Sequence, residues 1–561
     1  MSTVDFIENE RLRRLNLQRQ PDGRFRIAIP DYANIAADTV TQHAAGPRAE
    51  APALIYEAED GRLERFSYAA LENLASGFAA SLRNLGIEAG ARVAVHTGQR
   101  PATAIAHLAV YKLGAIAVTV SELYGPDTIS HILNDSGATA IVTTDKGWSA
   151  YRSRLSDFAS LRHVIVKGEA GPGELSFDGM VTGNGAVLEA VRTKAEDPAL
   201  LIYTSGSTGA PKGILHAHRA VHAYNVSTSL FYNLEVFEPD LVFWTPADWA
   251  WVGGLNDTVF PAWMHGHTMI ACQHRFDPEW ALGFMARHGI THGFFTPTAL
   301  KRLSQVHKPR ERFDIQLRSI FTGGESLPAE TLRWLSNELR IVCNEGYGLT
   351  EFNHMIGNCQ ALRPAKAGSM GFELPGHVAA LVDENGEPVP DGEIGEIVTA
   401  ADNATRFLGY WNQPELTQSM RLGPWWRTRD LALRDSDGYY HYRGRTDDLI
   451  KSAGYRIGPA EIEHVLLEHP AVADCGAIGI PDADRGEIVK VFVQLHRGHE
   501  GSDGLVRELK DLVMGRLGTY KVPRLIEFTG DLPITSSGKV SRKELRRREA
   551  DSRREADRGV L

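Results

Sequence analysis

The chain has 561 residues, 43% of them hydrophobic, and carries a net charge of −10 at pH 7. This length exceeds one ordinary domain and allows a core that buries an extensive sheet. The negative charge excludes a protein whose main partner is nucleic acid, because phosphate binding needs a concentrated basic surface.

The first predicted element is an amphipathic helix between Ser67 and Gly86, where apolar residues recur at intervals of three and four. Residues 92–96 are predicted as a buried strand, 101–113 as a helix and 115–120 as a strand. Such alternation is typical of a parallel α/β sheet. It predicts further strands at 140–142, 163–166, 199–203, 267–270, 293–296 and 319–322.

The pattern changes after Leu374, where short strands at 378–382 and 394–398 predict a β-rich subdomain over about 375–446. From Asp447 onward, a separate small α+β unit is predicted, with helices at 459–467 and 504–517 and strands at 475–480 and 489–495. The basic stretch 542–558 alternates with acidic residues and is interpreted as a solvated helical end.

Several features predict a cytoplasmic protein. The four cysteines have no CxxC spacing, so neither a disulfide framework nor a structural zinc site is expected. No secretory signal is visible at the start of the chain. The most apolar stretch, residues 104–120, contains His107, Lys112 and Gly114, which favours a buried helix and strand over a membrane span.

The segment 203–213 reads Tyr-Thr-Ser-Gly-Ser-Thr-Gly-Ala-Pro-Lys-Gly and follows the apolar run 199–202. Glycines let backbone N–H groups face an anion, hydroxyl groups add donors, and a lysine adds positive charge. The segment is not a Walker A loop, because that motif needs Gly-Lys-Ser/Thr. A flexible linker is the alternative. The candidate phosphate-binding residues are Thr204, Ser205, Gly206, Ser207, Thr208, Gly209 and Lys212.

This loop resembles the phosphate loop of the adenylate-forming superfamily, which includes acyl-CoA synthetases, luciferases and peptide-synthetase adenylation domains. The resemblance implies an α/β fold: a large N-terminal AMP-binding domain of parallel α/β sheets with the β-rich subdomain, and a small mobile α+β C-terminal domain. The boundaries would be 1–446 and 447–561, with Asp447 as the hinge within the segment 444–458. Without the resemblance, that segment would be interpreted as a solvated linker.

Two further motifs resemble the superfamily's nucleotide site. Gly324 and Glu325, in Gly-Gly-Glu, would line one face of the adenine. In Tyr-Gly-Leu-Thr-Glu, Tyr347 would stack on adenine, Thr350 would hold the α-phosphate and Glu351 would carry Mg²⁺. A hard cation prefers carboxylate oxygen and a purine prefers an aromatic face. Taken alone, each motif is also compatible with a turn or with core packing.

Three single residues match family positions. Asp430 would accept the ribose hydroxyls and Arg445 would reach ribose and phosphate. Lys539 would bridge the attacking carboxylate and the α-phosphate, where a cation stabilises the negative transition state. Each residue alone would be interpreted as a solvated charge or a surface ion-pair residue.

Residues 452–463 resemble the acetyl- and medium-chain acyl-CoA synthetase branch, and 248–254 resembles its acyl-pocket segment. Acetyl-specific members have a second tryptophan where this chain has Gly348. Loss of an indole would leave room for several methylenes, so an acid larger than acetate is expected. Medium-chain, branched and aromatic acids all remain open. The candidate pocket residues are Trp249, Trp251, Val252, Gly253, Gly348 and Arg456.

Coenzyme A residues follow from the same resemblance. Gly454 and Tyr455 would line the pantetheine tunnel, and Arg485 and Lys521 would meet the CoA phosphates. Without the resemblance, Arg485 and Lys521 would be interpreted as solvated surface residues.

The predicted function is ATP-dependent acyl-CoA synthesis with ATP, Mg²⁺ and coenzyme A, acting on a small carboxylic acid, in a chain that could form a homo-oligomer. A ligase that loads a separate carrier protein is the nearest alternative. A serine hydrolase is a distant one, because Ser536 and Lys539 fit Ser-x-x-Lys, but the partner motifs of that class are absent. A non-catalytic nucleotide sensor is disfavoured by the presence of both Glu351 and Lys539.

Overall fold

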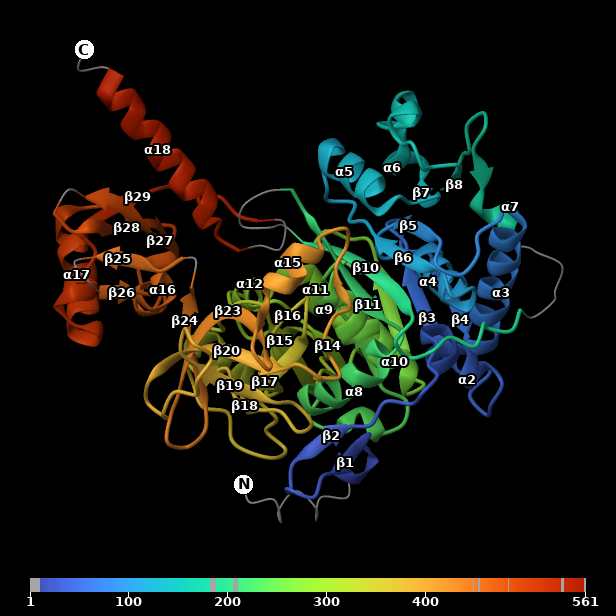
Figure 1. Cartoon of the computed structure of the whole chain (residues 1–561), viewed down its shortest axis with the longest axis horizontal. Coiled ribbons are helices and arrows are strands. Elements are labelled where there is room, and N and C mark those ends of the chain that lie inside the picture. The colour runs from blue at the N-terminus through green and yellow to red at the C-terminus, as the bar shows by residue number, and fades with distance from the viewer. Residues whose placement is uncertain are drawn as a thin grey trace. The chain divides into compact units, whose positions relative to one another are not determined.

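The computed structural model describes residues 11–181, 188–204, 210–446, 448–452, 455–482, 484–535 and 539–558. The chain divides into two compact units. The first comprises Met1–Lys366, Gly371–Val378 and Ala400–Arg421, and the second comprises Ala367–Met370, Ala379–Thr399 and Leu422–Leu561. Both units combine helices and strands (Figure 1).

One sheet of the first unit has eight strands in the order β21-β11-β10-β6-β5-β7-β8-β9. Neighbouring strands from β10 to β9 are parallel, whereas β11 is antiparallel to both β10 and β21. The strands are β5 Arg92–His96, β6 Ile116–Thr119, β7 Ala140–Thr144, β8 His163–Lys167, β9 Leu175–Ser176, β10 Pro198–Thr204, β11 Lys212–Ala217 and β21 Gly409–Tyr410.

The second sheet has nine strands in the order β18-β17-β16-β15-β14-β12-β13-β3-β4, with parallel pairs from β16 to β3 and antiparallel pairs at both edges. The strands are β3 Pro52–Glu57, β4 Leu63–Ser67, β12 Val242–Trp244, β13 Thr268–Cys272, β14 His292–Phe294, β15 Ser319–Gly323, β16 Val342–Leu349, β17 Asn353–Gly357 and β18 Phe372–Glu373. A separate hairpin pairs β1 Leu17–Arg19 with β2 Phe25–Ile27.

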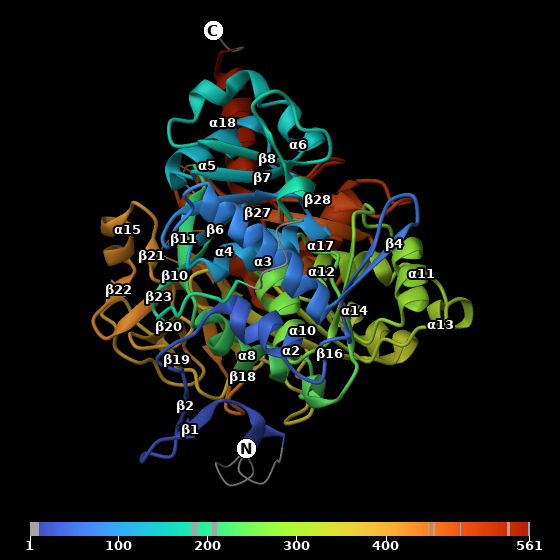
Figure 2. The same cartoon turned by 90° about the vertical axis from the view of Figure 1, so that its right-hand side faces the viewer.

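Helices cover these sheets (Figure 2). The α-helices of the first unit are α2 Gln42–Ala44, α3 Tyr68–Asn84, α4 Pro101–Lys112, α5 Pro126–Ser136, α6 Asp145–Ser149, α7 Phe177–Val181, α8 Ala220–Phe231, α9 Val252–Gly254, α10 Phe260–Met264, α11 Pro278–His288, α12 Pro297–Leu303, α13 Pro309–Arg312, α14 Ala329–Trp334 and α15 Pro414–Ser419. Short 3₁₀ or π segments are η1 Leu12–Arg14, η2 Ala37–Thr41, η3 Arg152–Asp157, η4 Glu235–Phe237, η5 Leu255–Val259 and η6 Leu335–Leu339.

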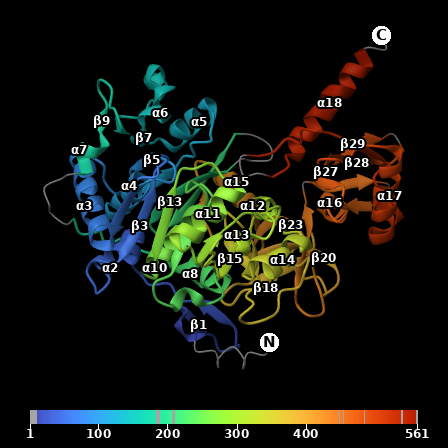
Figure 3. The same ribbon diagram turned by 180° about the vertical axis from the view of Figure 1, so that it is seen from behind.

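The second unit holds two five-stranded sheets, seen from behind in Figure 3. One has the order β19-β20-β23-β22 with β24 on β23, and the other β26-β25-β28-β27 with β29 on β28. Their strands are β19 Ala379–Val382, β20 Ile394–Ala400, β22 Arg421–Leu422, β23 Trp425–Arg434, β24 Tyr440–Arg445, β25 Ile450–Ser452, β26 Tyr455–Ile457, β27 Val472–Asp482, β28 Gly486–Leu495 and β29 Leu525–Phe528. The helices are α16 Pro459–Leu466, α17 Asp503–Leu517, η7 Thr519–Lys521 and α18 Arg542–Arg558.

The predicted elements are confirmed at nearly the predicted positions. Helix α3 begins after Ser67, whose hydroxyl accepts a hydrogen bond from the Ala70 N–H, as expected of an N-cap. Residues 104–120 form the end of α4 and the strand β6. In the part of the chain that the structure describes, no helix is long and apolar enough to cross a membrane.

The sequence pattern predicted the strands of the first unit, but it did not predict that they form two separate sheets. Those predicted at 267–270, 293–296 and 319–322 belong to the nine-stranded sheet, and the earlier ones to the eight-stranded sheet. The second unit contains residues 379–399 and 422–446 together with the segment from residue 447 onward, which was predicted as a separate domain. The proposed domain boundary at Asp447 remains a prediction, since Asp447 lies outside the described residues.

Candidate active site

The predicted phosphate loop connects two paired strands. Strand β10 ends at Thr204, β11 begins at Lys212, and these two residues face each other in the antiparallel register. The expectation that a buried strand leads into the loop is therefore confirmed. The remaining candidates of the loop, Ser205, Gly206, Ser207, Thr208 and Gly209, lie outside the described residues.

Tyr410 connects this hairpin to the predicted metal residue. Its strand, β21, pairs with β11, so Tyr410 lies opposite Ile214. The Tyr410 hydroxyl donates a hydrogen bond of 2.6 Å to Glu351 Oε1, and Lys212 Nζ lies 5.8 Å from the centre of the Tyr410 ring. The Tyr410 side chain thus contacts both Lys212 and Glu351, which are 139 residues apart in the sequence.

Glu351 is also fixed through its backbone, because its carbonyl oxygen accepts a 2.7 Å hydrogen bond from the Phe407 N–H. It is half-buried and lies in the turn after β16, directly after Thr350. A partly exposed carboxylate held in this way has the oxygen donors that Mg²⁺ prefers. The described residues include no group of three histidine, cysteine, aspartate or glutamate side chains that could hold a metal ion.

The two predicted adenine motifs lie at the ends of neighbouring strands. Gly323, which ends β15, pairs in parallel with Gly346 of β16. Gly324 has a φ of +90°, which suits glycine because it lacks a Cβ. The next residue, Glu325, accepts a hydrogen bond of 2.9 Å from Thr298 Oγ1. Tyr347 follows Gly346 and is buried.

The predicted acyl segment is connected to the phosphate hairpin by aromatic contacts. The Trp251 ring packs edge-on against Tyr124 with centroids 5.7 Å apart, and the Tyr124 hydroxyl donates to the carbonyl of Tyr203 at 3.2 Å. Trp249 is buried in the protein interior. Val252 and Gly253 open the short helix α9.

Four aromatic side chains form a closely packed group next to the predicted acyl segment 248–254. We term this group the aromatic wall, and its members are Phe231, Phe294, Phe321 and His354. Phe231 and Phe321 stack with centroids 4.2 Å apart, and Phe294 lies 5.1 Å from Phe321. The ring of His354 stands edge-on to both Phe231 and Phe321, at 4.8 Å.

Glycines of the predicted acyl pocket border the aromatic wall. A Cβ placed on Gly253 would lie 2.4 Å from the Phe294 ring. Gly348 pairs with His354 across β16 and β17, and a Cβ on Gly348 would lie 1.9 Å from the carbonyl oxygen of Asn353. The close approach of the two strands therefore requires glycine at position 348 for a backbone reason. A role of Gly348 in enlarging the pocket remains a prediction.

The predicted ribose residues are neighbours in the second unit. Asp430 of β23 and Arg445 of β24 face each other in register. The buried Asp430 accepts hydrogen bonds at Oδ1 from Arg445 Nη1 at 3.3 Å and from the Tyr442 hydroxyl at 3.2 Å. The arginine and tyrosine hold the carboxylate in one orientation, and Tyr442 was not among the residues predicted from the sequence.

Lys539 is exposed and lies at the base of a narrow loop of the second unit. Its N–H donates to Thr535 Oγ1 at 3.1 Å, and its carbonyl oxygen accepts from the Thr535 N–H at 2.7 Å. An antiparallel bridge pairs Ile534 with Val540.

The predicted CoA residues fall into two groups. Strand β25 lies between the strand that contains Tyr455 and the strand that begins at Gly486, directly after the exposed Arg485, and Ser452 pairs with both Tyr455 and Gly486. Lys521 is engaged elsewhere, in a 2.6 Å ion pair with Glu461 at the start of α16. The predicted residue Gly454 and the side chains of Tyr455 and Arg456 lie outside the described part of the structure.

Comparisons with known proteins match most of the chain. A family model described as AMP-binding enzyme matches residues 40–411, and one described as AMP-binding enzyme C-terminal domain matches residues 461–539. The acetyl-coenzyme A synthetase of Bacillus subtilis (strain 168) is 33% identical over 524 residues, which cover 91% of this chain and 90% of that protein.

Solved structures share the architecture. An anthranilate CoA ligase in complex with anthranoyl-AMP aligns with a TM-score of 0.82 at 29% identity, covering 92% of this chain and 97% of its own. A benzoate CoA ligase from Burkholderia xenovorans LB400 aligns with a TM-score of 0.80 at 28% identity, covering 91% and 99%. The predicted fold class, a large α/β N-terminal domain followed by a smaller C-terminal domain, is confirmed.

Proposed function

The chain belongs to the AMP-binding enzyme family, and on that premise we propose which residues activate its acid and what kind of acid it takes. It is an AMP-forming acyl-CoA synthetase: ATP and a carboxylic acid give an acyl-adenylate and pyrophosphate, and CoA then releases AMP and acyl-CoA. The small-molecule acid, ATP and CoA follow from this activity. The individual site residues, Mg²⁺ and the cytoplasmic location are our proposals.

The connection through Tyr410 carries the assignment of the nucleotide site. It joins Lys212, which adjoins the phosphate loop, to Glu351, the proposed Mg²⁺ residue. Thr204 and the loop that follows it would hold the β- and γ-phosphates together with Lys212, and Thr350 would hold the α-phosphate. Gly324, Glu325 and Tyr347 would surround the adenine. Asp430 and Arg445, which are already paired, would hold the ribose.

Bound at Glu351, Mg²⁺ would neutralise charge on the phosphate oxygens. The chain's own contribution is to orient that carboxylate, through the Tyr410 hydroxyl on its side chain and the bond from the Phe407 N–H to its backbone carbonyl. Lys539 would place its ammonium group between the attacking carboxylate and the α-phosphate. For the second half-reaction, rotation about Asp447 would replace Lys539 with the Gly454 loop and bring Tyr455, Arg485 and Lys521 towards CoA.

Replacing Tyr410 with phenylalanine should raise the Mg²⁺ concentration needed for half-maximal pyrophosphate release by on the order of 10-fold, because a hydrogen-bond partner of a metal ligand typically contributes this much to metal affinity. Mg²⁺ titrations at saturating ATP and acid would measure the effect. The matched control is Tyr32→Phe, since Tyr32 is exposed. Equal Mg²⁺ requirements for Tyr410→Phe and the wild type would refute the role of this hydroxyl.

We propose a small aromatic acid, or a short branched one, as the substrate. The predicted pocket residues Gly253 and Gly348 border the aromatic wall, so an acyl group entering there would meet flat rings. Rings favour an offset-stacked or edge-on aromatic partner, and Phe231 and Phe321 already stack in this way at 4.2 Å. The similar anthranilate and benzoate CoA ligases, named for aromatic acids, agree with this proposal.

A panel of acids tests the proposal through pyrophosphate release and acyl-CoA formation with free CoA. Benzoate or anthranilate should exceed acetate in kcat/KM by about 10-fold or more, since each buried methylene-sized group contributes about 0.8 kcal/mol. Phe294→Leu should shift the preference towards longer straight acids, whereas Phe276→Leu, outside the aromatic wall, should not. Octanoate as the best wild-type substrate would contradict the proposal. Failure to form acyl-CoA from any acid would contradict the activity itself.

A further inference from the structure

The residue that follows the proposed hinge is bound to the helix that follows Lys539. Asp448 Oδ2 accepts from Arg542 Nη1 at 3.0 Å, and Asp448 Oδ1 accepts from Arg546 Nη2 at 2.7 Å. Both arginines come from the first two turns of α18. The two oxygens of one carboxylate are therefore held by two guanidinium groups of one helix.

Arg542 continues this network to helix α16. Its Nε donates to Glu463 Oε1 at 2.9 Å, and its Nη2 pairs with Glu463 Oε2. Glu463 Oε1 also accepts from the Ala477 N–H of β27 at 2.8 Å. The side chains of Asp448, Arg542 and Glu463 are at most 20% exposed, so water screens these ion pairs less than it would at the surface.

The opposite charges dominate the electrostatics of the network. Burial alone would raise the pKa of Asp448, but Arg542 and Arg546 outweigh burial and hold that pKa below its usual value. The bidentate geometry of Arg542 on Glu463 fixes the direction of the guanidinium group as well as its position.

Lys539 is three residues before Arg542, and little freedom separates them. The Ser541 N–H donates to the carbonyl of Pro533 at 2.7 Å, and Ile534 pairs with Val540. Leu545, one turn into α18, is buried in a cluster with Ile478, Ile480, Phe492 and Leu532. The base of the lysine loop is therefore attached on one side to this cluster and on the other to Arg542.

Asp448, Glu463 and Arg542 all follow Asp447 in the chain. Rotation about Asp447 would leave their mutual contacts intact. We propose that Arg542 is a positioning residue for adenylation: it makes the segment after the hinge and the Lys539 loop turn as one body, so that Lys539 arrives at the α-phosphate in a fixed place. This inference rests on the proposed function of Lys539 and Asp447.

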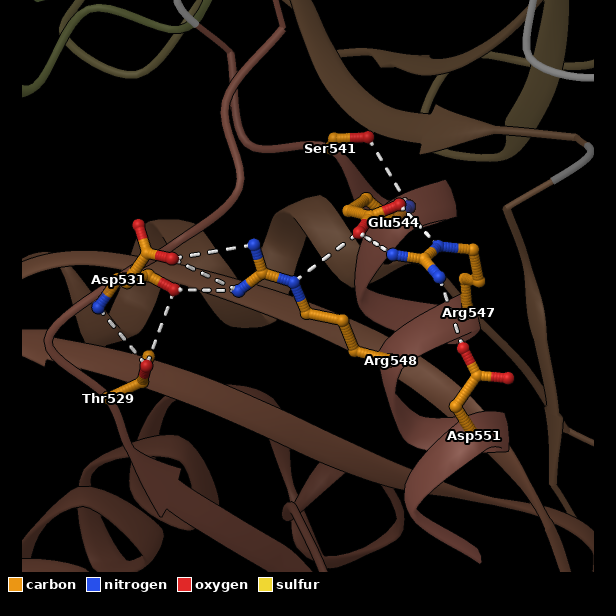
Figure 4. A network of polar contacts seen from close by, with 7 residues as sticks. All are labelled: Thr529, Asp531, Ser541, Glu544, Arg547, Arg548 and Asp551. Atoms are coloured by element: carbon orange, nitrogen blue, oxygen red, sulfur yellow. Dashed lines mark hydrogen bonds and ion pairs between the residues drawn. The ribbon is translucent and has the colours of Figure 1, made fainter. Parts of the chain in front are cut away.

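A matched control lies on the same helix. Arg547 pairs with Glu544 and Asp551, which belong to α18 itself (Figure 4). Arg548, which is also drawn there, reaches Asp531 on the segment that leads into the lysine loop. Arg547 is the better control because its ion pairs stay within one helix and do not connect the helix to the loop or the hinge.

The experiment compares the two half-reactions of the full-length enzyme. Arg542→Met should slow acid-dependent pyrophosphate release in single turnovers by about 10- to 100-fold, the effect expected of a misplaced catalytic group. Thioester formation from supplied acyl-AMP and CoA should stay within about 3-fold, because Lys539 is not needed there. Arg542→Lys, which keeps the charge, should restore part of the first rate, and Arg547→Met should change neither.

Equal losses in both half-reactions, or no loss in either, would overturn the inference. If Arg542→Met does not fold, Asp448→Asn provides the same comparison, since it removes the carboxylate charge that Arg542 contacts and leaves Glu463 in place. A wild-type enzyme that releases no pyrophosphate with any acid would instead refute the proposed function. The wild-type rates thus test the proposed function, and the ratio of the two half-reaction rates in the variant tests the positioning role of Arg542.

Discussion

Lys539→Ala is expected to slow acyl-adenylate formation by on the order of 10²-fold or more, the effect of losing one group that stabilises charge in a transition state. Adenylation brings a carboxylate to a negatively charged phosphate, and the ammonium group of Lys539 would offset that repulsion. Thioester formation starts from finished acyl-AMP and needs no such cation. The variant should therefore convert supplied acyl-AMP to acyl-CoA at nearly the wild-type rate.

Single-turnover measurements with and without supplied acyl-AMP separate the two steps. Lys543→Ala is the matched control, because Lys543 is an exposed lysine four residues later and should leave both rates unchanged. If Lys539→Ala reduced both half-reactions equally, one domain arrangement would serve the whole reaction. The rotation about Asp447 would then have to be abandoned.

The sequence predicted elements better than it predicted their assembly. Strands such as β5 and β10 have a buried apolar run at their centre, as expected for parallel strands buried on both faces, and this run located them. Pairing between strands distant in sequence leaves no comparable local pattern. The three-residue strand β12 has too few residues for any period to be visible, yet it joins β13 to β14.

The same distinction applies to the active site. Motifs that are contiguous in sequence, such as the segment 203–213 and the segment around Glu351, could be proposed as candidate sites from residue types alone, and their roles remain predictions. Tyr410 could not, because its importance comes from the pairing of β21 with β11. The available signal was the short aromatic run Gly409-Tyr-Trp411. The aromatic wall was missed for the same reason, since its four members come from four different elements.

Buried histidines should make the first unit sensitive to acid. Six that are at most 4% exposed have strongly lowered pKa values. Burial lowers their pKa values from 6.5 to about 4 for His96, His218 and His267 and to about 3 for His107, His216 and His377. Some of their nitrogens also act as acceptors, as where His218 Nδ1 accepts from the Ile35 N–H. A proton at such a nitrogen would remove the hydrogen bond.

The direction of the pH dependence follows from these values. Above about pH 7.5 the histidines are neutral in both states and contribute almost no pH dependence. As the pH falls towards 4, these histidines bind protons in the unfolded chain but stay neutral in the folded chain. The free energy of unfolding therefore decreases. Glu345 opposes this trend: burial raises its pKa from 4.5 to about 8, so the folded state gains relative stability as the pH falls from 8 towards 4.5.

The histidines outweigh Glu345 by number. Between pH 7.5 and 5.5, the six histidines should remove more stability than Glu345 returns, and the net loss should be on the order of several kcal/mol. That loss is comparable with the whole stability of a typical folded protein, about 5–15 kcal/mol. We therefore expect the urea midpoint of the first unit to fall sharply over this pH range.

Proton uptake provides a measurement that does not depend on a folding model. Unfolding by urea at pH 5.5 should take up about four to five protons per chain from these seven groups, measured with a pH-stat. His107→Phe should lower the uptake by about one proton, because His107 is buried and its pKa is depressed by burial alone. An uptake near zero, or one unchanged in His107→Phe, would mean that these histidines are already protonated in the folded protein. Acid lability would then have to arise from the carboxylate ion pairs and should begin below about pH 4.5, where carboxylates titrate.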